Sequence, residues 1–278
     1  MRERRITSRD NPDIRRWKKL SESSRARKEA GLMLIEGLHL ITAWRSARKE
    51  VLPTLLILGE RGAARHAIHS WLEEELRLDG FGECVYLPEA LFMKLSGTET
   101  PSGALAVAPL PSPAPLAGNL DTLVLDGVQD PGNLGALLRT AAAAGISQAV
   151  FSRDCADLWS PKALRAGQGA QFQLNLHADV DLPDFLRAFQ GETLATALLD
   201  AETLHEAAWP VDTPIAWVFG AEGQGIRASV LEAAKRRIRV FMPGAACRGG
   251  AVESLNVTAA AAICLFETLR RRQAAPMK

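Results

Sequence analysis

The chain has 278 residues, of which 47% are hydrophobic and 23% are charged, a composition typical of a globular protein with room for two modest domains. No apolar run reaches the length of a membrane span, and the first residues lack the apolar core of a signal peptide, so we expect a cytoplasmic protein. The four cysteines are scattered without a CxxC pair, and the histidines complete no ligand pattern, which predicts neither a disulfide framework nor a metal site.

The net charge of +1 is unevenly distributed, because residues 1–50 contain 14 Lys or Arg against 7 Asp or Glu. Basic residues cluster around Trp17, in the run Arg15–Lys19, and again in Arg25–Lys28. One interpretation is a solvated helix face with Trp17 packed inward. The other is a polyanion-binding surface on which Trp17 stacks against a base or sugar.

Apolar runs alternate with helical patterns through the first 95 residues. We expect strands near residues 32–35, 55–58 and 85–87, and helices from residue 37, over 61–78 and over 89–95. Four prolines then fall within residues 108–119, a run that can form neither a helix nor a central strand. This predicts an α/β domain over residues 1–108, a linker over 109–119 and a second domain over 120–273.

The second half begins with the apolar run Leu123–Leu125, which reads as a buried strand because the breakers Asp126 and Gly127 follow it. Apolar residues at helical spacing then lead to Gly145, a plausible helix C-cap. Further strands are expected at residues 149–152, 172–176, 193–198, 215–219 and 239–242, with helices over 182–190 and from residue 257 to the arginines at 270–272. This alternation also predicts an α/β domain.

Three polar blocks follow predicted strands in this half: DPGNLGALLR (130–139), FGAEGQG (219–225) and SLNV (254–257). Taken singly, each has a structural explanation. Arg139 could be a solvated residue on an outer helix face, and Ser254 and Asn256 could be helix N-caps. The glycine loop could be mistaken for a dinucleotide-binding turn, but its spacing and its late position disfavour a dehydrogenase.

The order and spacing of the three blocks resemble the SpoU, or TrmH-like, branch of the SPOUT RNA methyltransferases. The resemblance implies an α/β domain closed by a trefoil knot, an exception to the rule against knotted chains. It also implies S-adenosylmethionine binding in the knot and homodimers with the active site near the interface. The opening through Trp44, with Glu36 and Gly37 as its clearest positions, resembles more loosely the small ribosomal-protein-like substrate-binding domain that many members carry.

The resemblance also implies roles for individual residues in methylating a ribose 2′-hydroxyl of RNA. The residues carried over to catalysis are Asn133, Arg139, Glu222, Ser254 and Asn256, and those carried over to cofactor binding, through backbone groups, are Gly220, Val240, Met242 and Leu255. A guanidinium stays protonated, so we expect Arg139 to stabilise the developing alkoxide and to grip a neighbouring phosphate. A role as general base stays open. The two asparagines would orient the ribose and Arg139, while Ser254 and Glu222 support the loops.

Two features depart from the family pattern. Phe241 stands in Val240-Phe241-Met242, where relatives commonly read Ile-Pro-Met, and the insert CRGG precedes Glu253. Because the implied cofactor contacts are through the backbone, we expect binding to persist. The alternatives are a non-catalytic RNA-binding protein and the same chemistry on transfer RNA, although the basic N-terminal half favours ribosomal RNA.

Overall fold

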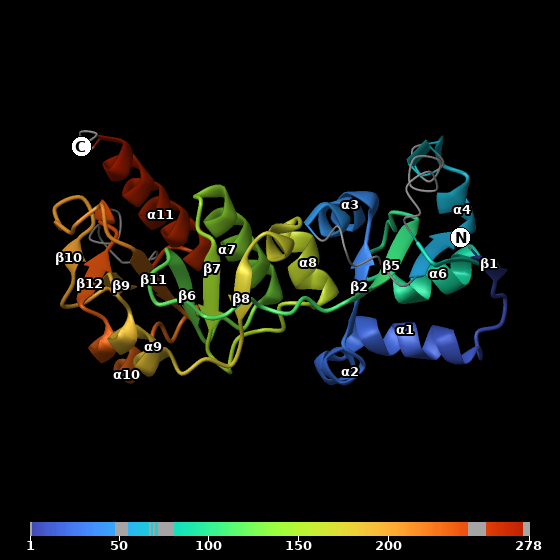
Figure 1. Ribbon diagram of the computed structural model, residues 1–278, viewed down its shortest axis with the longest axis horizontal. Coiled ribbons are helices and arrows are strands. Elements are labelled where there is room, and N and C mark those ends of the chain that lie inside the picture. Colours follow the sequence, from blue (N-terminus) through green and yellow to red (C-terminus); the bar gives the residue numbers. More distant parts are fainter. Residues whose placement is uncertain are drawn as a thin grey trace. The chain divides into compact units, whose positions relative to one another are not determined.

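The computed structural model describes residues 2–47, 55–66, 68, 70–71, 81–243 and 254–274. The chain forms two compact units, one made of Met1–Ser112 with Asp157–Phe172 and the other of Pro113–Ala156 with Gln173–Lys278 (Figure 1). Among the described residues, no helix is both long enough and apolar enough to cross a membrane.

The first unit is built on a five-stranded sheet in the order β1 (Arg2–Arg5), β4 (Glu83–Leu87), β3 (Leu55–Gly59), β5 (Ala104–Pro109) and β2 (Leu32–Glu36). Strand β5 is antiparallel to both neighbours, and the other pairs are parallel. Successive side chains of a strand face opposite sides. Leu34 therefore packs with helices α1 (Pro12–Glu22) and α6 (Glu89–Leu95), whereas Met33 and Ile35 pack with α3 (Leu38–Ala47).

Helix α1 shows where Trp17, the aromatic residue of the basic run, lies. Its first turn is capped by Asn11, whose Oδ1 accepts a hydrogen bond from the amide of Asp13 at 2.8 Å. Trp17 is only 4% exposed and belongs to the core beneath the helix. The prediction that Trp17 packs inward is therefore confirmed, and a role for Trp17 in stacking on a base is wrong, whereas binding of a polyanion by the cations of this helix stays a prediction.

Residues 157–172 pack in the first unit although the chain enters them from β7 (Gln148–Phe151) of the second. Their helix α8 (Pro161–Gly167) contributes Leu164 to the core around α3, and Phe172 joins the same core. The guanidinium of Arg27, on α2 (Ser24–Ala30), is buried and paired with Asp157. We call residues 157–172 the excursion. The predicted domain boundaries at residues 108 and 119 assigned these residues to the second domain, and the boundaries stay predictions.

Glu36 and Gly37 have structural roles in this packing. The Glu36 carboxylate is buried and accepts a hydrogen bond from Ser96 Oγ at 2.5 Å, and Arg165 Nη1 of α8 lies 3.5 Å away. Gly37 has a φ of 97°, a conformation that L side chains rarely adopt. The two positions therefore connect β2, α3 and the excursion.

The second unit contains a seven-stranded sheet in which every pair is parallel. Its order is β10 (Glu202–Thr203), β12 (Arg236–Arg239), β9 (Glu192–Thr196), β11 (Ile215–Gly220), β6 (Thr122–Asp126), β7 and β8 (Asn175–His177). Helices α7 (Pro131–Ala143) and α11 (Val257–Ala274) pack together on the face of Trp217, which donates to Thr268 of α11 at 3.0 Å. Helices α9 (Leu182–Ala188) and α10 (Ala228–Ala233) cover the other face, that of Val218 (Figure 1).

The structure corrects several predicted boundaries. Strand β8 begins at Asn175, because residues 170–172 form a 3₁₀ turn. Strand β12 ends at Arg239, so the apolar residues 240–242 follow the strand instead of forming it. Strands β1, β5 and β10 were not expected. Helix α4 (Glu60–Ala63) covers the start of the helix expected over 61–78, the rest of which lies partly outside the described residues. Residues 244–253, which include the CRGG insert, lie wholly outside them, and the trefoil knot stays a prediction.

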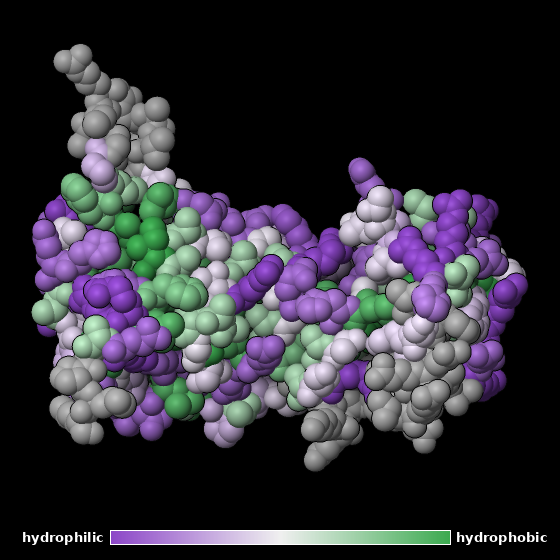
Figure 2. Space-filling view, turned by 90° about the horizontal axis from the view of Figure 1, so that it is seen from above, coloured by the Kyte–Doolittle hydropathy of each residue, from purple (hydrophilic) through white to green (hydrophobic). Residues whose placement is uncertain are grey.

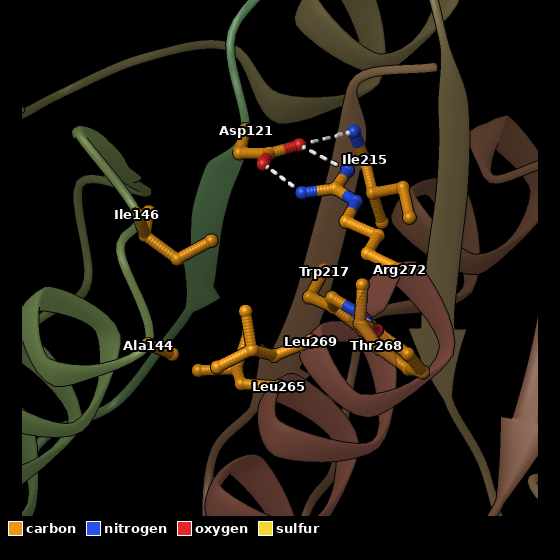
Figure 3. Close-up of a pocket in the computed structure, with 9 residues that line it drawn as sticks. All are labelled: Asp121, Ala144, Ile146, Ile215, Trp217, Leu265, Thr268, Leu269 and Arg272. Atoms are coloured by element: carbon orange, nitrogen blue, oxygen red, sulfur yellow. Dashed lines mark hydrogen bonds and ion pairs between the residues drawn. The ribbon is translucent and has the colours of Figure 1, made fainter. Parts of the chain in front are cut away.

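The last turns of α11 are anchored at the amino-terminal edge of the second sheet. Arg272 forms a two-pronged ion pair with Asp121, which directly precedes β6, and Asp121 also accepts a hydrogen bond from the amide of Ile215 at 2.9 Å (Figure 3). The cavity beside this pair measures about 20 Å³, room for roughly one water molecule. It is therefore too small for a nucleoside ligand.

Glu267 of α11 should make the free energy of unfolding depend on pH in the acidic range. Its carboxylate is 7% exposed and accepts hydrogen bonds from Arg270 (2.7 and 2.8 Å) and Arg271 (2.8 Å). The bond from Arg270, supported by Arg271, lowers the pKa of Glu267 from 4.5 to about 2. A carboxylate with a depressed folded pKa stabilises fully above its unfolded pKa, and this stabilisation is lost as the pH falls through the folded pKa.

In Glu267→Gln we therefore expect the free energy of unfolding at neutral pH to fall by about 2 kcal/mol. Its dependence on pH between about 4.5 and 2 should also flatten. Chemical denaturation across this range measures both, with exposed Glu206→Gln as the control. A pH dependence as steep as that of the parent protein would contradict the assignment.

Candidate functional site

Strands β6 and β11 lie side by side and parallel, but the chain leaves them in opposite directions. After β6 it runs through α7 to β7, on one side, and after β11 it runs through α10 to β12, on the other side. Helices α7 and α10 also cover opposite faces of the sheet. In parallel sheets such a reversal opens a crevice outside the carboxyl ends of the strands, where ligands bind. The loops after β6 and β11 are therefore the candidate site.

The first loop leads into α7 through a well-formed cap. Asp130 accepts a hydrogen bond from the amide of Asn133 at 2.8 Å, and Pro131 occupies the first helical position, where its missing N–H costs nothing. Asn133 consequently sits in the first turn of α7, next to the carboxyl end of β6.

The second loop is a tight turn that needs glycine. The backbones of Ala221 and Gly225 exchange two hydrogen bonds, at 3.1 and 2.9 Å, and Gly223 and Gly225 have φ of 91° and 71°. A Cβ on Gly220 would lie 2.2 Å from the carbonyl carbon of Gly225 and 2.4 Å from the amide nitrogen of Ile226. The loop therefore folds back onto the end of β11 and presents closely spaced backbone groups.

An ion pair that the sequence patterns did not reveal connects these two loops. Asp126, the last residue of β6, is 1% exposed and accepts hydrogen bonds from the amide and Nε of Arg227 at 2.9 and 2.8 Å. The hydrogen bond with Asp126 raises the pKa of Arg227. Arg227 directly precedes α10, so the pair holds the exit of the glycine loop against β6. The available signal was an acidic residue ending an apolar strand.

Asn256 joins all three blocks through one side-chain amide. Its Nδ2 donates to Glu222 Oε1 at 2.6 Å and to Asn133 Oδ1 at 3.3 Å. Its Oδ1 accepts hydrogen bonds from the backbone amides of Thr258 and Ala259 at the start of α11, at 2.9 and 3.4 Å. Asn256 is therefore a helix N-cap and also the link between loops that lie 123 and 34 residues away.

The predicted residues do not all meet. Asn133, Glu222 and Asn256 form one cluster, whereas Arg139 is exposed and makes no ion pair or hydrogen bond with the described part of the chain. It is six residues beyond Asn133, which corresponds to about 9 Å along the helix axis. Ser254 is also exposed and lies two residues before Asn256.

The residues expected to bind cofactor surround the same edge of the sheet. Gly220 ends β11, and Val240 and Met242 follow the end of β12, a strand parallel to it. Leu255 adjoins Asn256 and is 36% exposed, and Phe241 is 62% exposed. Because carboxyl ends of parallel strands share one edge, these backbone segments and the asparagine cluster lie at the same edge of the sheet.

Comparisons with known families agree with the two-part organisation. Residues 121–266 match the SpoU rRNA Methylase family, and residues 11–106 match the MRM3-like substrate binding domain. The first match includes every residue of the three blocks, and the second includes Glu36 and Gly37.

Several known proteins are similar along nearly the whole chain. The 23S rRNA (guanosine(2553)-2′-O)-methyltransferase RlmP of Bacillus subtilis is 33% identical, covering 94% of this chain and 97% of that protein. An uncharacterized tRNA/rRNA methyltransferase of Synechocystis sp. is 34% identical, covering 97% and 95%. The crystal structure of an RNA 2′-O ribose methyltransferase has a TM-score of 0.79 at 30% identity, covering 97% and 99%. An AdoMet-bound rRNA methyltransferase from Sinorhizobium meliloti, at 23% identity and a TM-score of 0.81, covers 97% and 98% and shares the fold.

Proposed function

Because the chain belongs to the SpoU rRNA methylase family, we propose that it transfers a methyl group from S-adenosylmethionine to a ribose 2′-hydroxyl of RNA. The observation that carries this proposal is the amide of Asn256, which draws Asn133 and Glu222 together at the switch point of the sheet. Three loops distant in sequence thereby share one crevice. Such a crevice is where an α/β sheet binds nucleotide-like ligands.

The second and third loops suit a nucleoside-containing methyl donor. Gly220 lets the backbone turn back on itself without a Cβ, and Phe241, between Val240 and Met242, is exposed. The backbone groups of Gly220, Val240, Met242 and Leu255 would hold the donor. S-adenosylmethionine supplies a methyl group already activated on a sulfonium. The protein must therefore place the acceptor hydroxyl in line and assist the loss of its proton.

The acceptor side is assigned to the asparagine cluster and Arg139. Asn133 and Asn256 would orient the ribose, Glu222 fixes the direction of the Asn256 amide, and Ser254 supports the loop before α11. The protonated fork of Arg139 would stabilise the alkoxide as it forms and grip an adjacent phosphate.

A second copy of the chain would complete this arrangement. Arg139 is exposed and separate from the asparagine cluster of its own chain, and Ile263 and Phe266 on α11 are 38% and 45% exposed. Figure 2, a view from above, shows hydrophobic residues gathered on the surface of the second unit, on the side where α7 and α11 lie in Figure 1. We assign this face to a homodimer interface, with the active site near it.

Ribosomal RNA is the proposed substrate, in preference to transfer RNA. The basic charge of the first 50 residues suits a polyanion, and the Bacillus subtilis relative is named for 23S rRNA. The first unit would bind this RNA, and the reaction would take place in the cytoplasm.

Asn256→Asp separates the two roles of Asn256. Aspartate caps a helix as well as asparagine does, so we expect the free energy of unfolding to change by less than about 1 kcal/mol. The introduced aspartate would have no N–H to donate to Glu222. It would also place a second negative charge where the Asn256 amide nitrogen now lies, 2.6 Å from the Glu222 carboxylate oxygen. Methyl transfer measured in a single turnover should therefore fall by about 10- to 100-fold. A parent-like rate would show that capping is the only role of this residue.

The proposal as a whole is tested by mapping 2′-O-methyl groups in total RNA from cells with and without the gene. We expect one or a few ribosomal nucleotides to lose methylation, and the purified protein with S-adenosylmethionine to restore it. A non-catalytic RNA-binding protein would bind RNA and leave every methyl group unchanged.

A further inference from the structure

The outer face of α1 carries four cations. The inward stripe is made of three buried residues at a spacing of three, Ile14, Trp17 and Leu20. The residues between them are exposed, and we call them the α1 basic face: Arg15, Arg16, Lys18 and Lys19. Helix α1 therefore combines a firmly packed inner side with an outer side on which cations predominate.

The fold makes little use of these cations. Lys18 Nζ lies 3.6 Å from Glu22 in an exposed pair, and Arg15 donates to the backbone carbonyl of Asp10 at 3.0 Å. The side chains of Arg16 and Lys19 make no ion pair or hydrogen bond with the part of the chain that the structure describes. These two are three residues apart on one helix face, where like charges repel each other.

Arg27 shows what a structural cation looks like in the same region. It is 3% exposed, pairs with Asp157 and donates to the carbonyl of Leu20 at 2.5 Å. A buried cation is tolerated only when it is paired in this way. The contrast with Arg16 and Lys19 indicates that the α1 basic face is kept available for a partner outside the fold.

We propose that the α1 basic face binds the phosphate backbone of the RNA substrate, an inference that rests on the proposed function and deepens it. Lysine and arginine bind phosphates and release condensed counterions, independently of sequence. Trp17 is buried, so the face offers no aromatic ring to a base. It would therefore position the RNA without reading its sequence. A membrane surface fits less well, because an interfacial helix inserts its apolar side, and that side of α1 is in the core.

The test variant combines Arg16→Gln and Lys19→Gln in the full chain, with in vitro transcribed 23S rRNA as the probe. Loss of two phosphate contacts should weaken binding roughly 10-fold at about 0.15 M KCl and make the slope of log K against log salt less negative by about 1.4. The control combines Arg61→Gln and Arg187→Gln, which removes the same charge from exposed positions elsewhere. It should bind within roughly two-fold of the parent protein. Circular dichroism should show that both variants keep the parent melting temperature.

An unchanged affinity and salt slope in the test variant, or an equal loss in the control, would overturn the inference. The inference would also be overturned if the test variant lost binding to vesicles of anionic phosphatidylglycerol but bound RNA as tightly as the parent protein. The outcome is separable from that of the proposed function. If the parent protein methylates no RNA, the function fails, whereas the salt slope still reports on the face. If the test variant methylates RNA with an unchanged kcat and a raised KM, the result supports both the proposed function and the role of the α1 basic face.

Discussion

In Arg139→Lys, we expect single-turnover methyl transfer to fall by about 10²- to 10³-fold, with an unchanged affinity for S-adenosylmethionine. Lysine keeps the positive charge but replaces a planar fork of five N–H donors by a compact ammonium. A residue that binds both an alkoxide and a neighbouring phosphate depends on that fork. Arg139 is exposed on α7 and makes no ion pair or hydrogen bond with the described residues to which donor binding is assigned. The substitution should therefore spare donor binding, which calorimetry can measure separately.

Arg187→Lys is the matched control, because Arg187 is exposed on α9, on the opposite face of the sheet. It should leave the rate unchanged. If Arg139→Lys stays within a few-fold of the parent rate, the fork is not needed. The pH dependence distinguishes the two roles left open for Arg139. A lysine acting as the general base would recover activity as the pH approaches its pKa of about 10.4, whereas an electrostatic clamp would lose activity there.

In Gly220→Ala, we expect at least a roughly 10-fold weaker affinity for S-adenosylmethionine and a free energy of unfolding lower by about 1–3 kcal/mol. The added Cβ would meet three backbone atoms of Gly225 and Ile226 at 2.2–2.4 Å, so the loop itself must move. Backbone is less able to yield than the end of a flexible side chain. The displaced groups are the ones assigned to the donor.

Gly118→Ala is the control for this experiment. Its Cβ would meet only a carbonyl oxygen of Ala188, at 3.5 Å, an ordinary contact. Calorimetry with S-adenosylmethionine and chemical denaturation should show both losses in the first variant and neither in the second. If Gly220→Ala loses stability but binds the donor normally, the loop after β11 is structural and the donor binds elsewhere.

The sequence predicted most of the second unit because its strands are uninterrupted apolar runs that end in breakers. The strand beginning at Leu123 and the helix after Asp130 illustrate this. Strand β12 was displaced by three residues because three of its four residues are arginines, and the apolar segment 240–242 directly after it looked more like a strand. Strand β5 is rich in alanine and runs into the prolines, which hid its central position in the first sheet.

The pairing of the site residues was less accessible from sequence. The three blocks identified Asn133, Glu222 and Asn256, but their contacts depend on β11 lying beside β6, and local periodicity carries no information about strand order. The excursion over residues 157–172 was missed for a similar reason. The apolar side of α8 predicts burial without saying that its partner is the core around α3. The Asp126–Arg227 pair joins residues 101 positions apart and is equally invisible in a local pattern.

The most direct measurement is a crystal structure of the full chain grown with S-adenosylmethionine. We expect the donor at the carboxyl ends of β11 and β12, in contact with the backbone at Gly220, Val240, Met242 and Leu255, with its methyl group directed toward the cluster of Asn133 and Asn256. A donor bound at any other place, or loops that separate around an empty crevice, would contradict the account.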